Sequence, residues 1–183
     1  MKARNICVVT GSRAEYGLLV PMLERIQSSS SSNLQLIVTG MHLSSEYGNT
    51  YRQIERDGFV PVKKIDMQLG GNSPASIGRS IGVGLIGFAD ALAELDPDLV
   101  VLLGDRFELL SVASAALVAS IPIIPIWEAA NKLPTTPIDI HLAFISTHSF
   151  YYYISASLFS NSIHSSSGVK TIGPSRILSF NSS

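Results

Sequence analysis

The feature that most constrains the fold is an apolar run, residues 99–103, that is followed at once by a glycine and a charged cluster. The run reads LVVLL without polar alternation, which is typical of a strand buried on both faces of a parallel sheet. Gly104 ends the run, and the alanine-rich segment 109–119 behind it favours a helix. In open α/β sheets, ligands bind beyond the carboxyl ends of such strands. We therefore expect the charges after Gly104 to lie at a ligand-binding edge.

Strand and helix patterns alternate along the first two thirds of the chain. Strands are expected at 5–10, 34–39, 59–65, 99–103 and 121–126. Helices are expected over 18–26, 51–57, 74–95 and 109–119. This alternation predicts an α/β fold, a Rossmann-like parallel sheet with helices on both faces.

Three positions refine this prediction. Pro61 weakens the third strand, which we therefore place near a sheet edge. Pro21 is expected early in the first helix, where proline is tolerated, and Ser73 with Pro74 marks the start of the long helix. That helix carries one apolar stripe, formed by Ile77, Ile81, Leu85, Phe88, Leu92 and Leu95. We expect its four glycines (78, 82, 84 and 87) to permit close packing on a neighbour.

Composition excludes several classes of protein. The chain has 183 residues and a net charge of -1, so nothing points to nucleic-acid binding. Its single cysteine, Cys7, lies in an apolar run, which indicates a buried, inert thiol and a reducing compartment such as the cytoplasm. The start of the chain has no signal-peptide pattern. The longest apolar window, 109–127, is interrupted by Pro122 and Pro125, so we expect no membrane span.

The character of the sequence changes near residue 124. Residues 1–124 are predicted to form the Rossmann-like domain, and residues 125–183 form a serine-rich segment without a convincing amphipathic helix. We expect much of this second segment to be disordered or poorly packed.

Gly11 to Gly17 follows the first strand and opens the first helix. A helix N-terminus favours anions, and Arg13 could add a charge-assisted contact to a phosphate. The dinucleotide fingerprint G-x-G-x-x-G is absent. The alternative is that Arg13 and Glu15 form a surface ion pair, and the pattern alone does not decide between the two.

Asp105, Arg106 and Glu108 suit proton transfer by a carboxylate beside an arginine that binds a phosphate or carboxylate. The alternative is a capping box with Asp105 as N-cap and Glu108 at the third helical position, and both can hold at once. His42 ends the second strand at the same edge, although a lone histidine is more often structural. With one cysteine and no paired histidine spacing, no metal site is expected.

Four motifs in order resemble the hydrolysing UDP-N-acetylglucosamine 2-epimerases of bacterial sialic and related nonulosonic acid synthesis. They are TGSRAEYG at 10–17, GMHL at 40–43 with YGNTY at 47–51, the segment 81–88, and GDRFE at 104–108. The similarity runs from residue 4 to about residue 123. It implies two Rossmann-like domains in the glycosyltransferase-B arrangement, no cofactor, and a homodimer.

The resemblance also implies a reaction and its residues. Members convert UDP-GlcNAc and water to ManNAc and UDP. They expel UDP by anti elimination to a 2-acetamidoglucal, to which water then adds with inversion at C2. Asp105 matches the catalytic acid/base, with Glu108 beside it as a second catalytic candidate. Arg13, Gly17 and Arg106 match contacts to UDP, and we count Glu15 and His42 with the substrate-binding residues.

The chain departs from the family after the fifth expected strand. The His-x-x-Gly-Gly-Glu segment of the family is missing, and Glu128 is not at the matching position. We interpret the chain as a truncated or frame-shifted epimerase with little or no turnover. The alternatives are half of a UDP-sugar glycosyltransferase and a non-catalytic remnant.

Overall fold

The computed structural model describes residues 2–104 and 106–126. They form one parallel sheet of five strands in the order β3-β2-β1-β4-β5. The strands are β1 (Arg4–Thr10), β2 (Ser32–Thr39), β3 (Lys63–Ile65), β4 (Leu99–Leu103) and β5 (Ile123–Ile126). The predicted Rossmann-like fold class is therefore confirmed, with β1 in the middle of the sheet.

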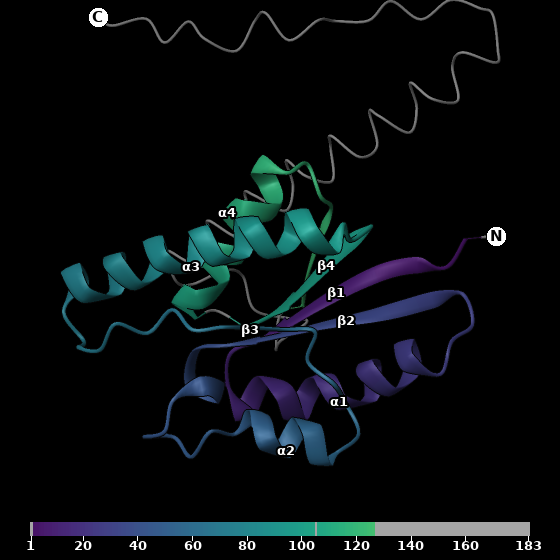
Figure 1. The fold of residues 1–183 in the computed structure, drawn as a ribbon, viewed down its shortest axis with the longest axis horizontal. Helices are drawn as coiled ribbons and strands as arrows, with labels where there is room; N and C mark the ends of the chain where they lie inside the picture. The colour runs from purple at the N-terminus through teal and green to yellow at the C-terminus, as the bar shows by residue number, and fades with distance from the viewer. Residues whose placement is uncertain (1, 105, 127–183) are drawn as a thin grey trace, which may run out of the picture.

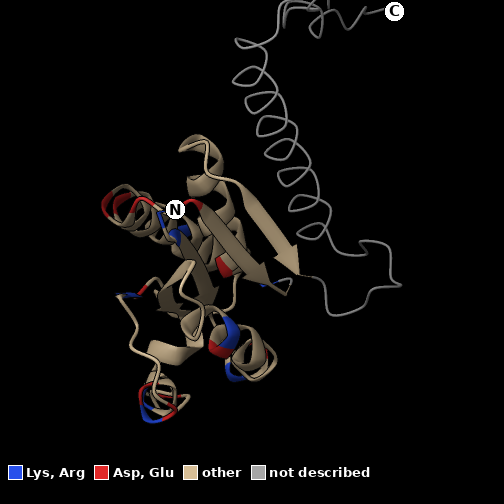
Figure 2. Ribbon diagram, turned by 90° about the vertical axis from the view of Figure 1, so that its right-hand side faces the viewer, with Lys and Arg blue, Asp and Glu red and all other residues tan. Residues whose placement is uncertain are grey.

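Helices cover both faces of the sheet (Figure 1). On one face lie α1 (Arg13–Gln27) and α2 (Tyr51–Arg56), and on the other lie α3 (Pro74–Leu95) and α4 (Phe107–Val118). A short 3-10 helix, η1 (Gly40–Leu43), follows β2. Each face has its own apolar core, and charged residues lie mainly on helices and loops rather than on the central strands (Figure 2).

Two strands are shorter than predicted, each for its own reason. The strand expected at 59–65 is reduced to Lys63–Ile65, since Pro61 has no N–H to donate and pairing starts only where the Val62 N–H donates to the Leu36 carbonyl at 2.8 Å. Its predicted place at the sheet edge is confirmed. The strand expected at 121–126 begins at Ile123, because the Ile121 N–H still bonds to the end of α4.

The long helix α3 lies where the sequence predicts it, and Ser73 caps it by accepting the Ser76 N–H at 3.1 Å. The predicted stripe is partly wrong, because Leu85 is 37% exposed while Gly84 is buried. A Cβ on Gly84 would lie 2.7 Å from the Met67 methyl, so this glycine does permit the expected close packing. The helix is long and apolar enough to cross a membrane by length and composition alone, and one side of it packs against α4.

Both helices that follow the central strands start at positions other than those predicted. Pro21 is the ninth of the 15 residues of α1 rather than an early one, because the helix already begins at Arg13. Helix α4 begins at Phe107 with Arg106 as N-cap, so the predicted capping box of Asp105 and Glu108 is wrong: Glu108 is the second helical residue, not the third. These two starts shape the candidate site.

Candidate functional site

The carboxyl ends of β1, β2 and β4 meet at one edge of the sheet, and each strand is followed by a glycine. These glycines are Gly11, Gly40 and Gly104. The loops behind them carry the residues that the sequence singles out, so the topology brings the three predicted segments to one edge. Asp105 and Glu128 lie outside the described residues.

Glu15 is buried beneath the start of α1, where it completes a capping box. Its Oε2 accepts the backbone N–H groups of Gly11 at 2.8 Å and Ser12 at 3.1 Å, while the Ser12 hydroxyl accepts the Glu15 N–H at 3.4 Å. Glu15 is 7% exposed and Arg13 is exposed. The interpretation of Arg13 and Glu15 as a surface ion pair is therefore wrong, because the helix start takes the carboxylate inward.

Glu108 is buried beneath the start of α4, where its carboxylate binds the side chain of Arg106. The Arg106 Nη2 donates to Oε1 at 2.8 Å, and Nε lies 3.3 and 3.2 Å from the two oxygens. The Glu108 side chain is 1% exposed and that of Arg106 is 34% exposed. The arginine therefore separates the carboxylate from solvent and itself remains accessible.

The three strand-end glycines make room for these two carboxylates. A Cβ on Gly40 would lie 2.7 Å from Glu108 Oε1, and one on Gly104 would lie 3.2 Å from Glu15 Oε1. A Cβ on Gly11 would lie 3.4 Å from Glu15 Oε2 and 3.8 Å from Glu108 Cδ. Gly40 and Gly104 also have positive φ angles of 56° and 103°. Glycine is needed at this edge for space as well as for backbone conformation.

The buried pair of carboxylates perturbs the local electrostatics. Burial raises the pKa of Glu15 above its ordinary value, and the charge of Glu108 raises it further, against the lowering effects of the Gly11 N–H and Arg106. Burial by itself lowers the pKa of Arg106, but the hydrogen bond and charge of Glu108 reverse this effect. Arg106 stays charged and is the cation of the edge nearest both carboxylates.

His42 is fully buried in η1 and connects two segments of the edge. Its Nε2 lies 3.1 Å from the Thr10 hydroxyl and its Nδ1 lies 2.7 Å from the Thr50 hydroxyl. Burial lowers the pKa of His42 to about 4, so the ring is neutral at pH 7. A substrate contact by His42 stays a prediction, and it would require one of these two bonds to break.

Arg13 and Arg106 line the same cavity. This cavity of about 360 Å³ is bounded by Ser12, Arg13, Ala14, Met41, Tyr47, Thr50 and Arg106. Gly17 lies one turn further along α1, on its exposed side. The shared cavity brings together the two arginines that the sequence predicts as contacts to an anion.

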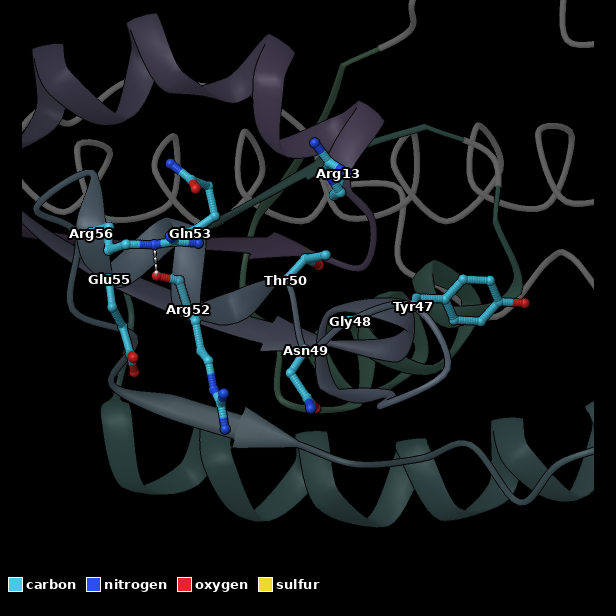
Figure 3. Close-up of a pocket in the computed structure, with 9 residues that line it drawn as sticks. All are labelled: Arg13, Tyr47, Gly48, Asn49, Thr50, Arg52, Gln53, Glu55 and Arg56. Carbon is cyan, nitrogen blue, oxygen red and sulfur yellow. Dashed lines mark hydrogen bonds between the residues drawn. The ribbon is translucent and has the colours of Figure 1, made fainter.

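A second, larger cavity of about 810 Å³ extends from Arg13 along α2 (Figure 3). Thr50 lies between Arg13 and the α2 residues, whereas Arg52 and Glu55 point toward β3 and away from Arg13. Sequence reasoning missed Met41, Tyr47 and Thr50 as lining residues. Their place in the loop after β2, at the predicted ligand edge, was the available signal.

Other reactive groups do not join this site. Burial raises the pKa of the Cys7 thiol to about 12, and the side chain is fully buried, which confirms the interpretation as an inert core cysteine. Within residues 2–104 and 106–126, no three His, Cys, Asp or Glu side chains lie close enough to hold a metal ion together.

Comparison with known proteins assigns the family. The family model described as UDP-N-acetylglucosamine 2-epimerase matches residues 24–126. The chain belongs to this epimerase family. The resemblance predicted from four sequence motifs is thereby confirmed.

Two curated relatives illustrate the match. The chain is 44% identical over 124 residues to the GDP/UDP-N,N'-diacetylbacillosamine 2-epimerase (hydrolyzing) of Campylobacter jejuni, with 68% of this chain and 32% of that protein covered. It is 42% identical over 123 residues to polysialic acid biosynthesis protein P7 of Escherichia coli, with 67% and 32% covered. The chain thus spans about a third of the length of these curated relatives.

Solved structures share the fold of this chain. The crystal structure of UDP-GlcNAc 2-epimerase from Neisseria meningitidis bound to UDP-GlcNAc superposes with a TM-score of 0.62 at 17% identity. It covers 79% of this chain and 38% of the Neisseria chain. The comparison supports the α/β architecture described above.

Proposed function

We propose that this chain is the N-terminal, substrate-binding half of a hydrolysing UDP-sugar 2-epimerase. The observation that carries the proposal is the cavity at the carboxyl edge of the sheet, where Arg13 and Arg106 face the same space. Two guanidinium groups and a helix N-terminus suit the diphosphate of a nucleotide sugar. Family membership supplies the reaction class.

The proposed chemistry is an anti elimination, in which a base removes the C2 proton as the C1–O bond to UDP breaks, to give a 2-acetamidoglucal. Water then adds across C1 and C2, so that its hydroxyl bonds to C1 and a proton returns to C2 with inversion. Negative charge grows on the departing diphosphate, so arginines aimed at it lower the barrier. Asp105 follows the described end of β4 and is our candidate for the carboxylate that moves the C2 proton. Arg13 and Arg106 bind the diphosphate, and the exposed Gly17 lies one helical turn beyond Arg13 in α1.

The substrate is a UDP-linked 2-acetamido sugar, either UDP-GlcNAc or a diacetamido relative. Relatives whose names specify UDP-N,N'-diacetylbacillosamine match at 44% and 41% identity, and one whose name specifies UDP-N-acetylglucosamine matches at 32%. These names favour the diacetamido sugar. We place the reaction in cytoplasmic sialic or nonulosonic acid synthesis.

A UDP-release assay with both UDP-sugars tests this function, with Asp105→Asn as the matched variant. The matched 124 residues span about a third of the Campylobacter relative, so we expect the 183-residue polypeptide to bind UDP but turn over little or no substrate. Release that disappears in the variant would show that this half catalyses by itself and would contradict the expected lack of turnover. Failure to bind UDP would contradict the proposed substrate class.

We also propose that two copies associate through α3. Val83, Leu85 and Ile86 are 37%, 37% and 67% exposed on this helix, and covering such side chains favours association. Light scattering after size exclusion should give twice the chain mass. A monomer at all concentrations would contradict this proposal.

A further inference from the structure

Among residues 2–104 and 106–126, the hydrogen bonds of Arg106 use one edge of its guanidinium and leave the other edge without a partner. Nε and Nη2 form the edge that binds Glu108, at 3.2 to 3.3 Å and 2.8 Å. The second edge, formed by Nη1 and Nη2, is the one that remains for a ligand, because a guanidinium presents its donors in a fixed fork. Arg106 lines the cavity and is 34% exposed, so this edge has access to it.

Glu108 cannot reach the cavity in the same way. Its carboxylate is 1% exposed, with Arg106 on one side and Gly40 on the other. Movement of the carboxylate toward a ligand would break its ion pair with Arg106. A carboxylate that loses its partner inside the protein carries a large energetic cost. Direct proton transfer between Glu108 and a sugar is therefore disfavoured by this arrangement.

Arg13 provides the contrast within the same cavity. It occupies the first position of α1 and is exposed, and within residues 2–104 and 106–126 no ion pair fixes its guanidinium. The carboxylate of its own loop, Glu15, is bound by backbone N–H groups instead. One arginine of the cavity is thus pre-oriented and the other is not.

We propose that Glu108 is a positioning residue that orients Arg106 toward the diphosphate of the substrate, rather than a group that exchanges protons with the sugar. The inference rests on the proposed function for the identity of the ligand. Pre-orientation lowers the conformational cost of binding, because Arg106 does not have to be ordered when the anion arrives. Gly40, which follows β2, contributes to this arrangement, because a side chain at this position would occupy the space of the Glu108 carboxylate.

Side-chain NMR on the 183-residue chain tests the positioning directly. In the wild type, the Arg106 Nε–H signal should be protected from exchange and its Nη signals resolved, because two bonds to Glu108 hinder rotation of the guanidinium. The corresponding signals of exposed Arg13 should be averaged. In Glu108→Gln, the Arg106 signals should collapse toward those of Arg13 while the dispersion of the backbone amides is retained.

UDP titration of the same samples provides the functional arm. Glu108→Gln should weaken UDP binding by about tenfold, the size expected when a charge-assisted contact loses its orientation. Glu94→Gln is the matched control, because it removes a partly exposed ion pair between Glu94 of α3 and Lys63 of β3, and it should leave binding unchanged.

Two results overturn the inference, and they differ from failure of the proposed function. Averaged Arg106 signals in the wild type would show that Glu108 does not orient the arginine, and this measurement needs no variant. Wild-type UDP affinity in a folded Glu108→Gln chain would show that orientation does not matter for binding. Absence of UDP binding by the wild type would instead overturn the proposed function, and with it the diphosphate as the group that Arg106 binds.

Discussion

The two loops that start α1 and α4 share the pattern G-x-R-x-E but differ in how their charges are arranged. The first reads GSRAE at 11–15 and the second GDRFE at 104–108. Helix α1 begins at its arginine, whereas α4 begins one residue later in the pattern, with the arginine as N-cap. This offset of one position decides which group binds each glutamate.

In α1 the glutamate is the third helical residue and reaches back to the free backbone N–H groups. In α4 it is the second, and it binds the arginine side chain instead. Identical spacing in sequence thus gives a free arginine in one loop and a fixed arginine in the other. The comparison teaches that the register of a helix start, rather than the residue types alone, determines which charges remain available for a ligand.

Replacing each of the two arginines by alanine should reveal the largest difference in stability between the two loops. Arg106→Ala leaves the Glu108 carboxylate buried without its partner, so we expect the free energy of unfolding to fall by about 2 to 3 kcal/mol. Arg13→Ala should lower it by less than about 0.5 kcal/mol, because the side chain is exposed. Urea denaturation of both variants provides the measurement. Equal losses would contradict the asymmetry.

Gly40→Ala tests the space that admits Glu108. The added Cβ would lie 2.7 Å from a carboxylate oxygen at a φ of 56°, so we expect a loss of about 2 kcal/mol in the free energy of unfolding. Gly58→Ala is the matched control, because its φ is 90° but nothing lies within 4 Å of the added atom. It should cost about 1 kcal/mol, the conformational part alone. If Gly58→Ala lost as much stability as Gly40→Ala, backbone conformation alone would explain both losses, and contact with Glu108 would contribute nothing.

Replacement of the Glu15 carboxyl by an uncharged amide, in Glu15→Gln, should change how the free energy of unfolding depends on pH. The pKa of Glu15 is raised on folding, so its contribution is fully present below the ordinary value of 4.5 and is lost as pH rises through the folded pKa. The stability of the wild type minus that of Glu15→Gln should therefore fall as the pH rises above 4.5, the ordinary pKa of a glutamate side chain. Thermal or urea unfolding across this range gives the difference. If the difference in stability between the two proteins did not change with pH, the pKa of Glu15 would be the same in the folded and unfolded states.

A small effect should come from the serine cap of α1. Ser12→Ala removes the side-chain oxygen that accepts the Glu15 N–H and should cost about 1 kcal/mol of unfolding free energy. Ser73→Ala, which removes the equivalent cap of α3, should cost about the same. Only Ser12→Ala should alter UDP affinity as well, because Ser12 also lines the cavity. Unchanged UDP binding in Ser12→Ala would place the diphosphate away from the start of α1.

Sequence patterns predicted the order of elements, the parallel sheet and the edge where the charged residues gather. The apolar run 99–103 and the alternation around it suffice for this, because buried parallel strands leave an unmistakable hydrophobic signal. Pro61 likewise predicted the edge strand, although pairing begins later than the apolar pattern suggests.

The arrangement inside the site could not be read from residue types. Arg13 with Glu15 suggests a surface pair, and Glu108 suggests a cap or an acid, yet both carboxylates are buried. Their burial depends on tertiary contacts: Gly40, from a different loop, supplies the space for Glu108. The sequence pattern likewise does not predict the hydrogen bonds of His42 to Thr10 and Thr50, because they join three different segments of the chain.

The most direct test of the central claim is a titration of the 183-residue chain with UDP, followed by backbone-amide NMR. Our account predicts saturable shifts confined to residues 11–13, 41–50 and 104–108, and a greater loss of affinity in Arg106→Ala than in Arg13→Ala. Shifts that do not saturate would contradict the claim that this edge binds the nucleotide diphosphate. Shifts centred on Gly58 and the far end of α2, with affinity intact in both arginine variants, would do the same.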